Sequence, residues 1–100
     1  MRILKQVLEI TDRKTYILPG TKIKPLCVKE QSGNLVMYFE TNASADEITD
    51  RVQQMPITVC IVGTGHLGND LVDFDYIGTA MMPWGLVWHC YVKDELTYDL

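Results

Sequence analysis

The segment from Ile57 to His66 constrains the fold more than any other part of the chain. It reads Ile-Thr-Val-Cys-Ile-Val-Gly-Thr-Gly-His, so an apolar, β-branched run leads directly into a polar turn with two glycines. A short apolar run that ends at glycine is typical of a strand buried on both faces. We therefore expect a central strand over residues 57–62, which presents residues 63–66 as a loop at the edge of a sheet.

The rest of the chain carries strand signals at a spacing of roughly ten residues. Besides 57–62, strands are predicted over residues 3–10, 15–18, 23–31, 35–41, 73–82 and 86–93. Residues 3–10 also fit one face of a helix. The pair Pro19-Gly20 is typical of a type II turn, and Ser32-Gly33-Asn34 is typical of a tight hairpin. Pro25 indicates an edge position or a bulge, because proline donates no hydrogen bond to a ladder.

One helix is predicted, over residues 42–55. Ser44 and Glu47 have the spacing of a capping box, and apolar residues recur on one face as far as Met55. Pro56 is expected to end this helix, because its ring is incompatible with a helix interior.

The composition fits one small domain. A chain of 100 residues with 47% hydrophobic residues is near the common domain size and can close a single core. Six or seven strands and one short helix predict a mainly β fold, a small antiparallel β-sandwich or open barrel, with α+β as the alternative class. We expect a β-rich domain over residues 1–93 and a polar tail over residues 94–100.

Charge and cysteine content limit the partners and the compartment. The formal charge of −4 opposes the binding of duplex nucleic acid. Cys27, Cys60 and Cys90 are odd in number and lie in apolar runs, which favours reduced thiols over a disulfide framework. No apolar run approaches the roughly 20 residues that span a membrane. The sequence thus predicts a cytoplasmic protein without a membrane partner.

Charge is also uneven along the chain. The basic residues of the first quarter leave room for one face that binds a small anion, and the second half is acidic, which would suit self-association or a basic protein partner. The basic residues are Arg2, Lys5, Lys14, Lys22 and Lys24.

The loop Gly63, Thr64, Gly65 and His66 is the best candidate for a binding site. It lacks the third glycine of a dinucleotide fingerprint and the lysine of a phosphate loop. Its glycines nevertheless allow close backbone approach, and Thr64 and His66 supply side-chain donors. The structural alternative is a bulge or tight strand exit.

His89 is the second histidine of the chain, and strand alternation places it on the face opposite to Cys90. If His66 and His89 approach each other, they share a ligand or act as acid and base, since imidazole titrates near neutral pH. Otherwise His89 is a hydrogen-bonded scaffold residue. A zinc site with Cys60 is disfavoured, because neighbouring His89 and Cys90 cannot converge, and we predict no metal and no cofactor.

Trp84 lies in a turn between Pro83 and Gly85. A tryptophan in a turn is difficult to bury and can anchor a partner, so we predict a partner-binding role for Trp84. Packing of the ring across the end of the sandwich is the alternative.

Four words of the sequence resemble a family of short phage and prophage proteins of unknown function. They are Ile10–Ile23, Val62–His66 (Val-Gly-Thr-Gly-His), Tyr76–Thr79 (Tyr-Ile-Gly-Thr) and Leu86–His89. The likeness spans nearly the whole chain. The family has a proline soon after the Gly-Thr-Gly-His word and a shorter middle segment, so the shape of this loop and the helix are not carried over. The resemblance implies a phage accessory protein that acts on host machinery or host immune signals, and it brings no assigned activity.

We therefore expect a non-enzymatic binding protein that forms a symmetric homo-oligomer and holds a small, nucleotide-like anion or a host protein. A host-defence inhibitor fits this expectation. The predicted ligand-binding residues are Gly63, Thr64, Gly65, His66, Tyr76 and His89. One alternative is a small phosphodiesterase that uses the two histidines, and another is a structural or assembly subunit.

Overall fold

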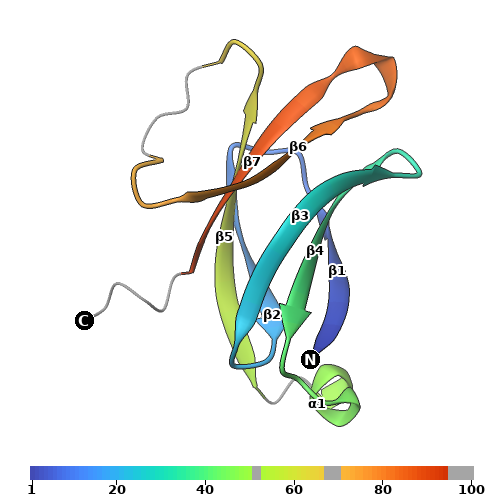
Figure 1. The fold of residues 1–100 in the computed structure, drawn as a ribbon, viewed down its shortest axis with the longest axis vertical. Helices are drawn as coiled ribbons and strands as arrows, with labels where there is room; N and C mark the ends of the chain where they lie inside the picture. The colour runs from blue at the N-terminus through green and yellow to red at the C-terminus, as the bar shows by residue number, and fades with distance from the viewer. Residues whose placement is uncertain (51–52, 67–70, 95–100) are drawn as a thin grey trace.

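All strands in the described part of the chain belong to two antiparallel sheets (Figure 1). The computed structural model describes residues 1–50, 53–66 and 71–94. The three-stranded sheet has the order β1 (Arg2–Leu8), β4 (Asn34–Thr41), β3 (Ile23–Gln31). The four-stranded sheet has the order β2 (Arg13–Pro19), β5 (Gln54–Gly63), β7 (Val87–Asp94), β6 (Asp75–Met81). The predicted mainly β sandwich is confirmed, and the sheets do not close into a barrel.

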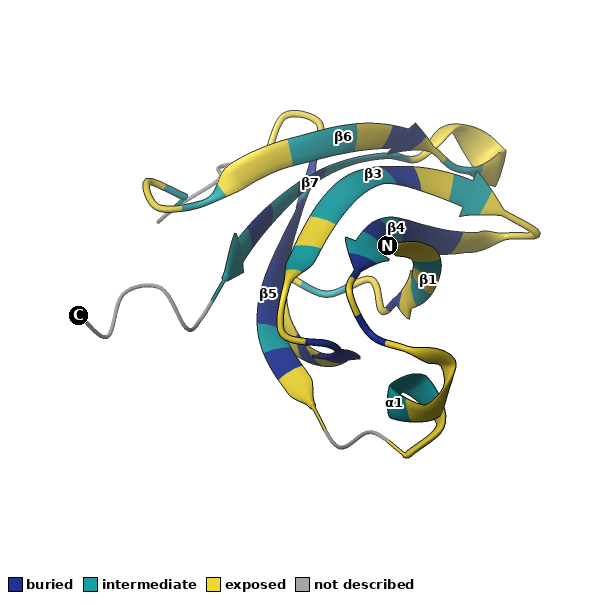
Figure 2. Ribbon diagram, turned by 60° about the horizontal axis from the view of Figure 1, so that its bottom comes forward, coloured by how far each residue is buried: buried dark blue, intermediate teal, exposed yellow. Residues whose placement is uncertain are grey.

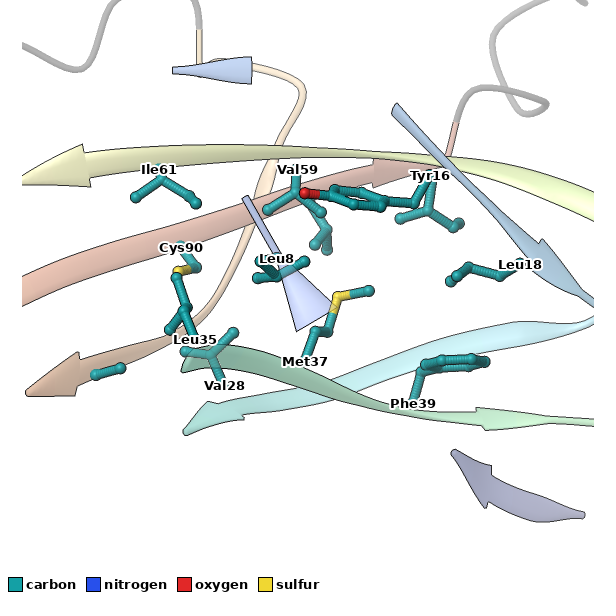
Figure 3. Packing of buried hydrophobic residues seen from close by; sticks show 13 residues of the cluster. Leu8, Tyr16, Leu18, Val28, Leu35, Met37, Phe39, Val59, Ile61 and Cys90 are labelled. Carbon is teal, nitrogen blue, oxygen red and sulfur yellow. The ribbon is translucent and has the colours of Figure 1, made fainter. Parts of the chain in front are cut away.

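The core lies between the two sheets and follows from strand alternation. On β4, Leu35, Met37 and Phe39 share one face, and all three are buried. They meet buried side chains of the four-stranded sheet, among them Leu18 and Val59 (Figure 3). Apolar residues at every second position thus hold the two layers together.

β1 is a strand and not a helix, because it pairs with β4 along its whole length. Leu8 is buried, whereas Ile3 and Val7 point away from the core and are exposed. The hairpin between β3 and β4 is also confirmed. Ser32 and Gly33 form its two-residue loop with φ values of 53° and 85°, and positive φ at both positions is the hallmark of a type I′ turn.

The edge strands β3 and β6 run side by side where the two sheets meet (Figures 1 and 2). Each carries a bulge, between Pro25 and Cys27 in β3 and between Tyr76 and Gly78 in β6. The prediction for Pro25 is therefore confirmed both as an edge position and as a bulge. At Gly78 the strands are so close that an added Cβ would lie 3.3 Å from the Cγ2 atom of Val28.

The helix α1 (Ala45–Asp50) is shorter than predicted. Its capping box is present, since the Ser44 amide donates to Glu47 at 3.0 Å and the Glu47 amide donates to Ser44 Oγ at 3.2 Å. The predicted end at residue 55 is wrong, because Met55 and Pro56 already pair with β2. Residues 51–52 lie outside the described residues. Backbone pairing with β2 and burial of Met55 outweigh the helical periodicity of this segment.

The end of the chain also differs slightly from the prediction. β7 runs to Asp94, so the polar tail cannot begin at that residue, and residues 95–100 lie outside the described ranges. The strand predicted over residues 73–82 is β6, which begins at Asp75 and ends at Met81; residues 67–70 are not described. Within the described residues, no helix is both long and apolar enough to cross a membrane.

The three cysteines are free thiols in different environments. Cys60 and Cys90 are buried, and Cys27 is half-buried. Burial raises the pKa of the Cys90 thiol from 9.0 to about 12.

We expect Cys27 to react first with a disulfide reagent at about pH 8, while Cys90 stays protected until the chain unfolds, because the thiolate is the reactive form. The raised pKa also makes the stability of the domain depend on pH. The pKa of Cys90 is 9.0 in the unfolded chain and about 12 in the folded chain, so between these pH values the thiol is protonated in the folded state and ionised in the unfolded state. The contribution of Cys90 to the free energy of unfolding should therefore be fully present below pH 9 and be lost as the pH rises toward 12. Thiol titration with and without urea tests the first point. Urea unfolding of wild type and Cys90→Ala tests the second, and an equal decline in both would contradict the assignment.

Candidate functional site

Three of the predicted ligand-binding residues meet on the outer face of the four-stranded sheet. His89 on β7 pairs with Thr79 on β6 and with Val62 on β5. Paired residues in an antiparallel sheet share a face, and this face points away from the core. The site is built from the middle of β6 and β7 and from the loop that follows β5.

A row of hydrogen bonds connects the side chains on this face. His89 Nε2 lies 2.8 Å from Thr64 Oγ1, and His89 Nδ1 lies 2.9 Å from Thr79 Oγ1. Thr79 Oγ1 is also hydrogen-bonded to the Tyr76 hydroxyl. We call Thr64, His89, Thr79 and Tyr76 the His89 row. Thr64, Thr79 and Tyr76 are exposed, and His89 is half-buried.

Each side chain of the His89 row can act as a hydrogen-bond donor or as an acceptor. A neutral imidazole has one donor and one acceptor, whereas a hydroxyl can serve as either, so both tautomers of His89 fit between Thr64 and Thr79. A protonated ring would donate to both hydroxyls. The row can therefore present donors or acceptors to a ligand without losing its internal hydrogen bonds.

Aromatic and cationic groups lie beside the row on the same sheet. The rings of Tyr76 and Tyr91 make an edge-to-face contact with centroids 5.4 Å apart. Next to them, the Arg13 guanidinium lies 5.0 Å and the Lys93 ammonium 5.7 Å from the centre of the Phe74 ring. These contacts are favourable cation–π interactions. The cations here are not the amino-terminal basic residues that the sequence singled out.

His66 lies on the other side of the sheet. Gly63 pairs with Trp88, whose side chain packs against the core. A Cβ added to Gly63 would lie 2.8 Å from His66 Nδ1 and 3.3 Å from the Trp88 ring, so the imidazole of His66 occupies the Trp88 side of β5. His66 and His89 therefore face opposite sides and do not share a site. The absent side chain of Gly63 is what lets the His66 ring approach the strand.

The loop around His66 is exposed and hollowed. A cavity of about 200 Å³ is lined by Asp12, His66 and Trp88, and another of about 390 Å³ is lined by Thr64, His66 and Leu86. Gly65 has a φ of 86°, and a Cβ there would meet no atom within 4 Å, so this glycine serves the turn and leaves the surface open. The loop thus lies at a rim, as predicted. It contributes Thr64 to the face that carries His89 and His66 to the opposite face.

Sequence reasoning missed Thr79, and the reason is the bulge in β6. Tyr76 and Thr79 are three residues apart, so strict alternation would put them on opposite faces. The bulge between Tyr76 and Gly78 adds one residue, which returns both side chains to the same face. Gly78, with a φ of 149°, is the signal that could have suggested an irregular strand.

A larger cavity of about 430 Å³ lies between β3 and β6, and its volume is within the usual range of ligand pockets. The two bulged segments line it with Leu26 and Ile77, and buried Ile57 and Val92 contribute to its walls. Tyr76 lines this cavity and also belongs to the His89 row. Tyr76, on the edge strand β6, thus connects the cavity with the His89 row.

Trp84 is fully displayed. Its side chain is 97% exposed in the turn η1 (Pro83–Gly85). The alternative that the ring packs across the end of the sandwich is therefore wrong.

Within the described residues, no three histidine, cysteine, aspartate or glutamate side chains converge in a way that could hold a metal ion.

Comparison with known proteins identifies a family and no activity. The profile of a domain of unknown function, DUF7352, matches residues 1–98. The chain belongs to the DUF7352 family. Neither a curated protein nor a solved structure matches the chain. The match supports the resemblance to a family of unknown function, and it carries no information on phage origin.

Proposed function

We propose that this DUF7352 domain is a non-enzymatic binding protein that holds a small, nucleotide-like ligand on the outer face of its four-stranded sheet. The observation that carries the proposal is the His89 row, in which Thr64, His89, Thr79 and Tyr76 are hydrogen-bonded and reachable from solvent. Convergent polar groups beside a cavity are typical of small-molecule sites.

The neighbouring groups support a ligand with a flat ring and a phosphate. Aromatic side chains such as Tyr76 and Tyr91 offer surfaces on which a base can stack. The hydroxyl groups of the row can donate to phosphate oxygens, and Arg13 and Lys93 provide positive charge on the same sheet despite the net charge of −4. Gly63 and Gly65 shape the loop that carries Thr64.

Binding without turnover is favoured over phosphodiester cleavage. A paired-histidine mechanism needs one imidazole as acid and another as base at the same phosphate. Since His66 and His89 face opposite sides of the sheet, they are not arranged for this mechanism. The proposed biological setting is a phage accessory protein in the host cytoplasm, where sequestering a nucleotide signal would inhibit host defence.

We expect His89→Ala to weaken nucleotide binding about tenfold, which corresponds to ~1.4 kcal/mol. The loss follows because Thr64 and Thr79 lose the ring that orders them. The measurement is a titration of the isotope-labelled protein with AMP, GMP, CMP, UMP and cyclic AMP, followed by amide chemical shifts. Phosphorus NMR of the cyclic AMP sample reports any cleavage of the phosphodiester.

The matched control is His66→Ala, which removes the same side chain from the opposite face and should change affinity less than about twofold. Equal losses in both variants would contradict the proposed location. The binding proposal fails if no nucleotide shifts the amides of β6 and β7, and the non-enzymatic assignment fails if wild type cleaves cyclic AMP and His89→Ala does not.

A further inference from the structure

The edge strands β3 and β6 approach each other closely at one place and diverge from it toward their first residues, Ile23 and Asp75 (Figure 2). The close approach is at Gly78, where an added Cβ would lie 3.3 Å from the Cγ2 atom of Val28. The cavity of about 430 Å³ lies on the diverging side, and both Ile23 and Asp75 line it. We call it the β3–β6 cavity.

The inner wall of the β3–β6 cavity is apolar and belongs to the core. Ile57 and Val92 are 1% and 6% exposed, and both line the cavity. Further apolar lining residues come from the two edge strands: Ile23, Pro25, Leu26 and Ile77. An apolar group that enters the cavity therefore contacts core side chains directly, and its transfer from water into this environment is favourable.

The opening of the cavity carries one charge of each sign, on different strands. Lys24 on β3 and Asp75 on β6 line the cavity and are exposed, so they lie where it meets solvent. Among the residues that the structure describes, neither side chain forms an ion pair. Lys93 and Asp94 of β7 also line the cavity, but both already interact with other groups. One ammonium and one carboxylate group are thus available to a ligand.

We propose that the β3–β6 cavity binds a small zwitterion with an apolar side chain, of the chemical class of free leucine or phenylalanine. The side chain of the ligand fills the cavity against Ile57 and Val92. The ammonium group of the ligand donates to Asp75, and its carboxylate accepts from Lys24. A ligand with a single charge would attract one of these two residues and repel the other, whereas a zwitterion is complementary to both.

The volume of the cavity also favours a small ligand. It lies toward the lower end of the range of roughly 300–1,000 Å³ that is usual for small-molecule pockets, so a long acyl chain would not fit. This site is separate from the His89 row, although Tyr76 contributes to both. Val92 pairs with Asp75 and faces the core, whereas His89 faces outward, so the proposal does not rest on nucleotide binding.

Titration of the isotope-labelled protein with L-leucine and L-phenylalanine, followed by the NMR shifts of its methyl groups, tests the proposal. At millimolar concentrations of at least one of these amino acids, the methyl groups of Ile57, Ile77 and Val92 should shift. The methyl groups of Ile3, on β1 at the far edge of the three-stranded sheet, should not. His89→Ala should leave this binding unchanged, so the two proposed sites can be confirmed or rejected separately.

Matched ligands test the recognition of both charges. Isopentylamine and isocaproate keep the apolar group of leucine but lack the carboxylate and the ammonium group, respectively. Phenethylamine and hydrocinnamate are the corresponding analogues of phenylalanine. Each analogue should bind about threefold more weakly than its parent amino acid or worse, because one partly exposed ion pair is lost.

Two substitutions assign the charges to residues. Asp75→Asn should weaken amino-acid binding about threefold to fivefold but hardly affect the analogue without the ammonium group. Lys24→Gln should weaken it similarly but hardly affect the analogue without the carboxylate. The matched controls are Asp73→Asn and Lys22→Gln. These residues are exposed, lie two positions away and do not line the cavity, so each control should change affinity less than about twofold.

Three results would overturn the proposal. The first is that neither amino acid shifts the methyl groups of Ile57, Ile77 and Val92. The second is that an analogue with one charged group binds as tightly as its parent amino acid. The third is that Asp75→Asn and Lys24→Gln weaken binding no more than their matched controls do.

Discussion

Replacement of Gly20 by alanine should lower the free energy of unfolding by about 3 kcal/mol or more, because two unfavourable effects add. Gly20 has a φ of 120°, which L residues rarely adopt. An added Cβ would also lie 2.2 Å from Thr41 Oγ1. Thr41 cannot move aside easily, because its buried hydroxyl donates to the Pro19 carbonyl at 2.6 Å and accepts from the Ala43 amide at 3.1 Å.

Urea unfolding followed by circular dichroism measures this loss, and a domain with ~5–15 kcal/mol of stability can still fold after it. The control is Gly33→Ala. Gly33 has a φ of 85°, but a Cβ there would meet no atom within 4 Å, so only the backbone effect of about 1–2 kcal/mol should remain. Equal losses at Gly20 and Gly33 would show that the contact with Thr41 is not responsible.

Phe39→Ala should be destabilising by about 3–5 kcal/mol, the usual range for a buried phenylalanine. The Phe39 side chain is 2% exposed and lies among the side chains that fill the space between the sheets (Figure 3). Truncation removes apolar contacts and leaves a cavity, because the two sheets are held apart by the rest of the core. The denaturant midpoint should fall while the slope of the transition stays constant.

An exposed strand residue provides the comparison for Phe39. Ile3 on β1 is 62% exposed, and Ile3→Thr keeps a β-branched side chain, so its effect should stay within about 0.5 kcal/mol. If Phe39→Ala does not fold, Phe39→Leu gives the same ordering with a smaller loss of about 1–2 kcal/mol. A Phe39 variant as stable as the Ile3 variant would contradict the core described above.

The candidate site illustrates how a small irregularity changes a prediction. The sequence correctly indicated that His89 faces away from Cys90 and that a loop rich in glycine follows β5. It did not indicate that Thr79 would join His89, because the β6 bulge shifts the alternation by one residue. It also left open whether His66 and His89 meet, and the Gly63–Trp88 pairing places them on opposite faces.

The start of α1 could be predicted from neighbouring residues, whereas its end depends on a segment far away in the sequence. The capping box of Ser44 and Glu47 is a contact between residues three apart, so the sequence alone located the start of α1. Its end could not be predicted in this way. Met55 has helical spacing from Ile48, but it pairs with Leu18, which lies far away in the chain.

The amino-acid sequence by itself determined the strands, the Ser32-Gly33 hairpin, the helix cap and the alternation that buries Leu35 and Phe39. These features depend on residues a few positions apart, whose side-chain and backbone preferences are local. The tertiary structure alone decided the order of the strands, the assembly of the His89 row and the full exposure of Trp84. Periodicity shows which residues share a face of one strand, whereas neighbouring strands are selected by packing between distant segments.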